Sequence, residues 1–239
     1  MSREDPAPAA ARTRSLNAQW EGRPEAYEEL RQCWLNERRL RFLADRLQAA
    51  DLPAGSRVLE LGCGTGWLVR QLAGRLPHLE FTGLDPDPTY VRFAREQAAH
   101  GNERYVEGTA EELPAASEGV AVVLSNDVLH HVASLAGTFE SAARAGRAGT
   151  EWIAIEPNYL NPYTFARQQF TAGERNFFPR QAVRVAGASG WRLVGRRHLF
   201  LIPPFVRAAP PWMIEVERRF ERIPVLAGGV CLRLTLGDR

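Results

Sequence analysis

The chain has 239 residues, 45% of them hydrophobic, which suits one α/β domain with insertions. All 30 basic residues are arginines, and with 28 acidic residues they leave a formal net charge of +2. This near-balance of charge argues against a protein whose main function is to bind nucleic acid. Without lysine, the chain also cannot use a Schiff-base lysine or a lysine general base.

The three cysteines and the N-terminal residues exclude further classes. Cys33, Cys63 and Cys231 are widely spaced and form no CxxC pair, so we expect neither a zinc site, nor any other metal, nor a disulfide framework. The N-terminus lacks the apolar stretch of a secretory signal, and no apolar run approaches the roughly 20 residues of a membrane span. We therefore expect a cytoplasmic protein without a membrane span.

The first 50 residues divide into two parts. Residues 1–15 are rich in alanine, proline and charge, and we expect them to be disordered. Residues 16–50 are expected to form an N-terminal helical segment, because apolar residues recur near the 3.6-residue period from Pro24 to Ala50.

Residues 51–157 alternate between strand and helix patterns and are expected to form the core. Strands are predicted at 57–61, 79–84, 104–107, 120–124 and 152–155, and helices at 66–75, 88–100 and 135–147. Apolar strands that alternate with helices indicate a parallel sheet covered on both faces.

Residues 158–239 are expected to complete the same domain with substrate-cap insertions and the final strands. Two aromatic or proline-rich insertions are predicted at 157–178 and 203–224, the second around a helix. A helix is predicted at 179–188, and strands at 191–195, 197–201 and 230–236.

A glycine-rich turn lies between the first predicted strand and the first core helix. Gly62, Gly64 and Gly66 let the backbone turn sharply, and the following helix directs its N–H groups at a ligand, which suits an anionic group. A plain strand–helix turn is the alternative. The third glycine comes one residue too early for the Gly-x-Gly-x-x-Gly of dinucleotide folds, and Glu60 lies two residues before the first.

Three further segments follow the next strands. Asp85 ends the second strand, where an acid can accept both ribose hydroxyls; a helix N-cap is its alternative role. Segments 107–114 and 124–132 follow the third and fourth strands. All four segments therefore meet at one edge of the sheet.

Together these segments resemble the class I, Rossmann-like S-adenosylmethionine-dependent methyltransferases, of the type 11 and quinone-biosynthesis-like small-molecule family. The resemblance covers roughly residues 55–157. It implies a doubly wound, mostly parallel seven-stranded sheet with the last strand antiparallel. It also implies S-adenosyl-L-methionine as the cofactor and S-adenosyl-L-homocysteine as its product.

The resemblance further implies roles for individual residues. The methionine part would lie along Glu60, Gly62, Cys63 and Gly64, the ribose and adenine at Asp85 and Pro86, the adenine edge at Thr109, Ala110 and Glu111, and the sulfonium end at Ser125 and Asn126. Two positions depart from the family, which usually has Asp where Thr109 and Ala121 stand.

Methyl transfer from a sulfonium needs a base only when the acceptor must lose a proton. His130 and His131 are the candidates, and we favour His130; the alternative is that they cap or pack the next helix. Expected substrate-binding residues are Glu156, Tyr163, Phe177 and Trp212, with an ordinary cap core or a dimer surface as the alternative for the aromatic ones.

Other side chains carry weaker expectations. Trp20 and Tyr27 are expected to fold over the cofactor. Arg167, Arg175 and Arg180 are candidates to receive an acidic group, although scattered surface arginines are the simpler interpretation.

The sequence thus predicts a methyltransferase that acts on a small apolar or aromatic molecule, with O-methylation favoured. Its only predicted partner is this methyl acceptor; no nucleic acid is expected, and a homodimer is compatible with the sequence. A non-catalytic cofactor-binding scaffold is the main alternative, followed by a nicotinamide-dependent oxidoreductase. A base-methylating enzyme is disfavoured, because Ser125-Asn126-Asp127 does not match the Asn/Asp-Pro-Pro-aromatic signature of amino methylation on bases.

Overall fold

The computed structural model describes residues 23–171 and 174–238 of the chain. The expectations for residues 1–15 and for Trp20 lie outside these residues. From residue 23 on, the predicted N-terminal helical segment forms two helices, α2 (Pro24–Arg31) and α3 (Trp34–Ala49), separated at residues 32–33. No helix in the described part of the chain is both long and apolar enough to cross a membrane.

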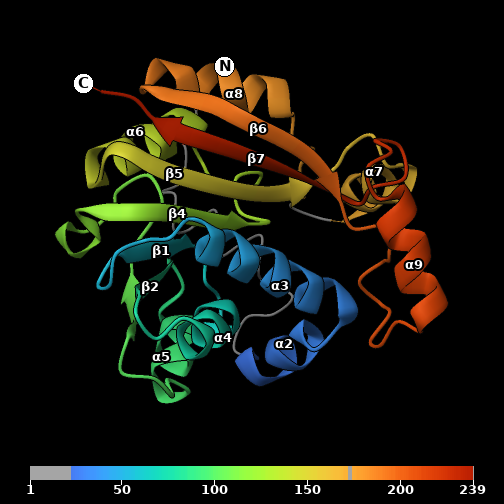
Figure 1. Ribbon diagram of the computed structural model, residues 1–239, viewed down its shortest axis with the longest axis horizontal. Coiled ribbons are helices and arrows are strands. Elements are labelled where there is room, and N and C mark those ends of the chain that lie inside the picture. The colour runs from blue at the N-terminus through green and yellow to red at the C-terminus, as the bar shows by residue number, and fades with distance from the viewer. Residues whose placement is uncertain (1–22, 172–173, 239) are drawn as a thin grey trace, which may run out of the picture.

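A single seven-stranded sheet organises the molecule (Figure 1). Its strands are β1 (Arg57–Leu61), β2 (Glu80–Asp85), β3 (Glu103–Glu107), β4 (Val120–Asn126), β5 (Gly146–Pro157), β6 (Trp191–Leu199) and β7 (Gly229–Leu236). Their order is β3-β2-β1-β4-β5-β7-β6, and β7 runs antiparallel to both of its neighbours. The predicted mostly parallel sheet with an antiparallel last strand is therefore confirmed.

Side chains that alternate along the strands build a core on each face of the sheet. On β4, Val122 and Leu124 pack with α3, α4 (Trp67–Arg75) and α5 (Pro88–Glu96). Val123 points to the opposite face, where α6 (Leu135–Ala145) and α8 (Pro179–Ala188) cover the sheet. Burial on both faces explains why β4 is an uninterrupted apolar run over most of its length.

Two helices from the predicted insertions lie at the end of the sheet where β4 and β5 end (Figure 1). The first, α7 (Pro162–Phe170), was not predicted, because its aromatic residues show no clear periodicity. Its start does carry a signal: the Asn161 side chain accepts a hydrogen bond from the Thr164 N–H, and Pro162 occupies the first turn. The second, α9 (Pro211–Phe220), confirms the helix predicted within 203–224.

Buried carboxylates attach α9 to the rest of the molecule. Glu217 accepts hydrogen bonds from Trp34 Nε1 at 3.0 Å and Arg38 Nε at 3.0 Å. Its other oxygen accepts the backbone N–H groups of Leu201 and Ile202. The segment that connects β6 to α9 is thereby fixed to α3.

A second acid attaches α2 to the glycine-rich turn. Glu28 accepts a hydrogen bond from the Thr65 hydroxyl and pairs with Arg70 at the start of α4. This arrangement places the inner side of α2 over the turn, at the carboxyl ends of β1 and β4.

Candidate active site

The glycine-rich turn follows β1 in an unusual backbone conformation. Gly62, Gly64 and Gly66 have φ angles of 66°, 54° and 74°, which side-chain-bearing residues rarely adopt. A Cβ atom at Gly62 would come within 2.6 Å of a Val128 methyl carbon. The glycines therefore permit both the turn and the close approach of the loop that follows β4.

Asp85 connects the end of β2 to this turn. Its Oδ2 accepts the Gly64 N–H at 2.8 Å and its Oδ1 accepts the Asp87 N–H at 3.0 Å. Burial raises the pKa of Asp85 to about 6, while these two hydrogen bonds act in the opposite direction. The N-cap of α5 is Asp87, so capping is not the role of Asp85.

A cavity of about 470 Å³ lies beside the turn, and we call it the loop cavity. Eight of the predicted cofactor residues line it: Gly62, Gly64, Asp85, Pro86, Thr109, Ala110, Glu111 and Asn126. Glu111 also accepts the Ala133 N–H at 2.8 Å and thereby joins the loop after β3 to the loop after β4.

Three predicted cofactor residues do not line the loop cavity. Glu60 is buried, and its burial raises its pKa to about 8. Cys63 is buried, with its thiol against Gly83. The Ser125 hydroxyl accepts a hydrogen bond from Trp152 Nε1 at 3.0 Å. Adjacent strand and turn residues point to opposite sides, and the sequence motif does not reveal which side faces the cavity.

Helix α2 supplies lining residues that the motifs did not identify. Tyr27 lies 5.5 Å from the ring of Tyr90, centroid to centroid, and both line the loop cavity. The Arg31 guanidinium lies 5.0 Å from the centre of the Tyr27 ring and lines the same cavity. Because α2 lies outside the region of the four motifs, the sequence pointed to this helix only through the expected position of Tyr27 over the cofactor.

His130 uses both of its ring nitrogens, which speaks against the predicted role as a general base. Nδ1 lies 2.7 Å from Glu156 and Nε2 lies 3.1 Å from Glu174. Burial alone would lower the pKa of His130, but these two carboxylates raise it to about 10. At neutral pH the ring is therefore an imidazolium, which has no free lone pair to accept a proton.

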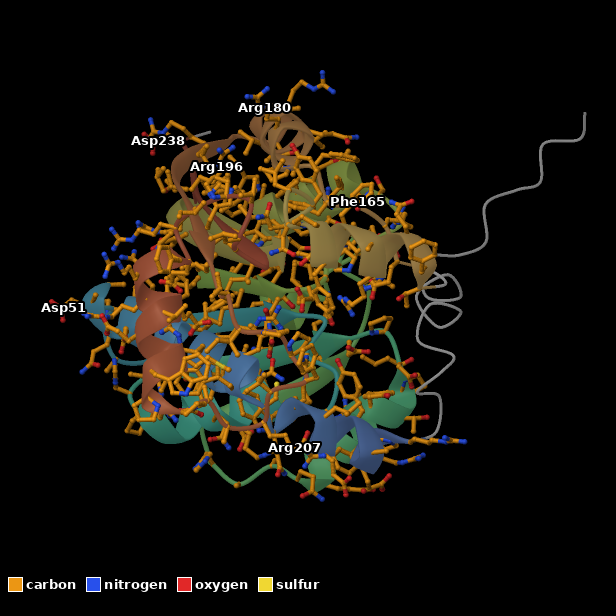
Figure 2. The ribbon with its side chains drawn as sticks, turned by 90° about the vertical axis from the view of Figure 1, so that its right-hand side faces the viewer. Asp51, Phe165, Arg180, Arg196, Arg207 and Asp238 are labelled. Carbon is orange, nitrogen blue, oxygen red and sulfur yellow. The ribbon has the colours of Figure 1, made fainter. Side chains whose placement is uncertain are left out.

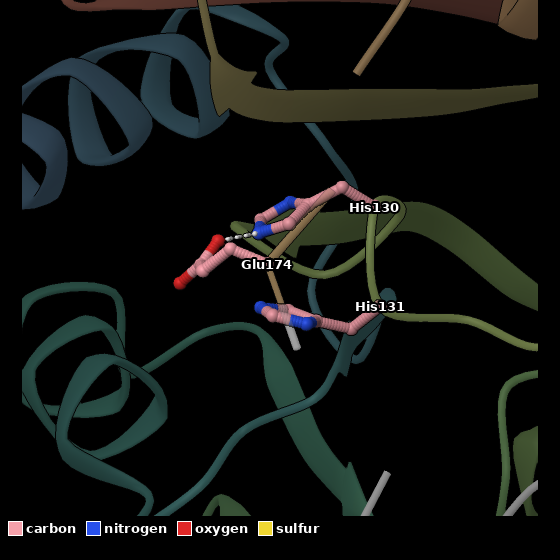
Figure 3. A group of neighbouring side chains, drawn as sticks. All are labelled: His130, His131 and Glu174. Carbon is pink, nitrogen blue, oxygen red and sulfur yellow. Dashed lines mark hydrogen bonds and ion pairs between the residues drawn. The ribbon is translucent and has the colours of Figure 1, made fainter. Parts of the chain in front are cut away.

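His131, in contrast, is the neutral member of the pair. Its ring centre lies 3.9 Å from that of His130, and both side chains project toward Glu174 (Figure 3). Burial and then the positive charge of His130 lower the pKa of His131 to about 4. Within the described residues its buried Nδ1 has no hydrogen-bond partner, and the side chain lines the loop cavity.

His130, His131 and Glu174 also form a potential metal-ligand set, with ligand atoms within 4.8 Å of one another. Two imidazoles and one carboxylate suit a divalent transition metal. Metal coordination would require His130 to lose a proton, and the hydrogen bond between His130 Nε2 and Glu174 to break. The hydrogen bonds of the structure favour the protonated ion-pair arrangement.

The comparisons agree with this geometry. Residues 58–149, which supply most of the loop cavity, match the family described as "Methyltransferase domain". Over these residues the chain is therefore similar to methyltransferase domains. The chain is 37% identical over 110 residues to a ubiquinone biosynthesis O-methyltransferase of Methylobacterium sp., covering 44% of this chain and 42% of that protein. It is 39% identical over 82 residues to the biotin biosynthesis bifunctional protein BioCD of Bordetella avium, covering 34% and 17%.

The chain therefore spans less than half the length of these two relatives. Solved structures share the methyltransferase fold over most of the chain. A putative sarcosine dimethylglycine methyltransferase from Galdieria sulphuraria superposes with a TM-score of 0.65 at 15% identity, covering 85% of this chain and 87% of that one. A possible histamine N-methyltransferase from Thermotoga maritima gives 0.57 at 21% identity, covering 87% and 98%.

A second cavity of about 460 Å³, which we call the cap cavity, lies next to the loop cavity. Tyr27, Arg31, Asp127 and Arg167 line both cavities, so the two adjoin. Apolar lining residues of the cap cavity include Leu30, Leu35, Tyr163, Phe200, Ile202 and Phe205. Of the four predicted substrate-binding residues, only Tyr163 lies here.

The other three predicted substrate residues line neither cavity. Glu156 is fully buried and accepts the backbone N–H groups of Val128 and Leu129, so it holds the loop after β4. Phe177 is 3% exposed and packs in the core beneath α6 and α8. Trp212 is 64% exposed on α9. Residue type alone could not separate these positions, because their roles depend on which side of each element faces the cavities.

The three arginines considered as partners for an acidic group of the substrate lie in three different surroundings. Arg175 donates hydrogen bonds to the backbone oxygens of His130 and Val132 and so fixes the loop that carries the histidines. Arg180 projects outward from α8 (Figure 2). Only Arg167 lines the cavities.

Proposed function

We propose that the protein is an S-adenosylmethionine-dependent methyltransferase that acts on a small, apolar or aromatic molecule, with oxygen as the favoured acceptor atom. The carrying observation is that the glycine turn, Asp85 and the loop after β4 line one cavity, which adjoins a second, largely apolar cavity. A cofactor and an acceptor can therefore meet at the wall that the two cavities share.

The polar groups of the loop cavity fit the cofactor. Asp85 has lone pairs left to accept ribose hydroxyls, and Pro86 and Ala110 offer apolar contact to an adenine. The buried Asn126 Oδ1 has no hydrogen-bond partner in the described residues, so it can accept a hydrogen bond from the amino group of the methionine part. The Arg31 guanidinium makes no ion pair within the described residues, so it can bind the carboxylate of the methionine part.

When bound, S-adenosylmethionine would supply a methyl group for transfer to the acceptor, and S-adenosylhomocysteine would be the leaving group. The chain's own residues then position the acceptor and exclude water at the shared wall. For a hydroxyl acceptor, the neutral ring of His131 receives the proton as the oxygen–carbon bond forms. The charged ring of His130 holds the loop and keeps the neighbouring ring neutral.

Calorimetry with S-adenosylhomocysteine tests the proposal. We expect binding to the parent chain, and Asp85→Ala should weaken it by about 1.5–3 kcal/mol, the usual range for hydrogen bonds to a charged group. The control is Asp45→Ala on the exposed side of α3, which should leave the affinity unchanged.

Equal affinities of the two variants would remove Asp85 from the site. Binding of NADH in place of S-adenosylhomocysteine would support the oxidoreductase alternative. S-adenosylhomocysteine binding without methyl transfer to any acceptor would support the scaffold alternative.

A further inference from the structure

The wall between the two cavities carries an excess of positive charge. Three charged residues line both cavities: Arg31, Asp127 and Arg167. Asp127 pairs with Arg39 at 2.6 Å, and this arginine helps hold the pKa of Asp127 below its usual value even though burial acts to raise it. Arg31 and Arg167 make no ion pair within the described residues, so two positive charges remain without a contacting carboxylate.

The two arginines approach the wall from different elements. Arg31 belongs to α2 and lies against Tyr27, beside the glycine turn, where the proposed function assigns it the carboxylate of the cofactor. Arg167 belongs to α7. Burial acts to raise the pKa of Glu174, but its hydrogen bond to the positively charged His130 and, to a smaller extent, the charge of Arg167 hold this pKa below its usual value. The charge of Arg167 is therefore left for a second ligand.

The remainder of the cap cavity suits an apolar molecule. Ile202 and Phe200 are 3% and 2% exposed and form its inner wall, and Leu35 adds a partly buried side chain from α3. Tyr163 lies on α7, one helical turn before Arg167, with its ring 6.4 Å from that of Phe205. Its volume falls in the range of about 300–1,000 Å³ that small-ligand sites occupy.

We infer that the acceptor is an amphiphilic anion, with an apolar body in the cap cavity and a carboxylate at Arg167. This inference rests on the proposed function and specifies its substrate class. A guanidinium binds a carboxylate through two parallel hydrogen bonds, so Arg167 fixes the end of the acceptor nearest to the cofactor. Tyr163, on the same side of α7, contacts the apolar body.

Two pairs of probes, each with the same apolar body and either a carboxylate or a neutral carboxamide, test the inference: 2-naphthoate against 2-naphthamide, and decanoate against decanamide. Binding is measured by calorimetry on protein saturated with S-adenosylhomocysteine. In at least one pair the carboxylate should bind about 10-fold or more tightly than the amide, the effect expected of a charge-assisted pair. Arg167→Gln should abolish this preference while the amide still binds, which shows that the variant is folded.

Matched control variants distinguish effects at the cap cavity from effects of removing any exposed side chain. Arg180→Gln removes an exposed arginine of α8 that lines neither cavity and should keep the preference. Tyr163→Ala should weaken both members of a pair about equally, whereas Phe170→Ala, 90% exposed on the same helix, should weaken neither.

Equal binding of carboxylate and amide in both pairs, no binding of any probe, or an unchanged preference in Arg167→Gln would overturn the inference. The affinity for S-adenosylhomocysteine is measured first and separately. Its absence refutes the proposed function, whereas bound S-adenosylhomocysteine without a carboxylate preference refutes the acceptor class alone.

Discussion

At the scale of single residues, two adjacent histidines have opposite charge states because their surroundings differ. Glu156 and Glu174 contact both ring nitrogens of His130, whereas His131 receives the field of that cation. The folded pKa of His130 lies above that of an unfolded histidine. Its ion pairs therefore stabilise the fold fully below about pH 6.5, and this contribution is lost as the pH rises through about 10.

Nitrogen-detected NMR of the imidazole rings measures both states directly. Between pH 6 and 8, we expect the imidazolium pattern for His130 and the neutral pattern for His131. Glu174→Gln should lower the pKa of His130, because it removes one of two carboxylates, whereas Glu140→Gln on the exposed side of α6 should not change it. A His130 ring that titrates near pH 6.5 in the parent protein would contradict the assignment.

At the scale of elements, the cap is attached by buried acids and not by an apolar face. Glu217 is 1% exposed and satisfies two side chains of α3 and two backbone N–H groups after β6. These N–H groups belong to Leu201 and Ile202, which line the cap cavity. Glu217 therefore both attaches α9 and helps to fix the shape of the cap cavity.

Removing this carboxylate should therefore be costly. We expect Glu217→Ala to lower the free energy of unfolding by about 3 kcal/mol or more, because Trp34 Nε1–H and two backbone N–H groups lose their acceptor, even though Arg38 keeps its ion pair with Glu221. Glu215→Ala, two residues earlier on the exposed side of α9, should leave the unfolding midpoint in urea unchanged. Similar midpoints for both variants would show that Glu217 does not anchor the helix.

At the scale of the whole molecule, the loop cavity joins segments that are distant in the sequence. Tyr27 and Arg31 on α2 face the glycine turn, and Arg167 on α7 faces the loop after β4. A ligand that contacts all of these segments at once should stabilise the entire fold, because unfolding any of them removes part of the site.

Thermal unfolding with S-adenosylhomocysteine measures this linkage. At a concentration of 100 times its dissociation constant, the ligand should contribute about 2.7 kcal/mol. For a chain of this length that raises Tm by about 5–10 °C. Arg31→Gln should reduce the shift, whereas Arg180→Gln should not. A shift below about 1 °C at saturation would contradict a ligand site that spans these segments.

Much of the core was predictable at this scale because strand burial leaves a direct pattern in the sequence. The apolar run of β4 and the turn at Gly62–Gly66 predicted both the sheet and the side of the loop cavity. The sequence could not place Phe177 and Trp212, which line neither cavity, since an aromatic residue in an insertion packs inward or outward according to tertiary contacts alone. The contribution of Arg31 was missed because it depends on where Glu28 holds α2.

The position of the cap-cavity residues in the sequence has a consequence for how this cavity can change during evolution. Apart from Asp127, every residue that lines the cap cavity lies outside residues 58–149, the segment matched as a methyltransferase domain. Under the proposed function, changes at residues that line the cap cavity alone can therefore exchange one acceptor for another while the glycine turn and Asp85 stay the same. On this proposal, only the wall that the two cavities share constrains both sites at once, because a substitution at Tyr27, Arg31 or Arg167 alters the cofactor side and the acceptor side together.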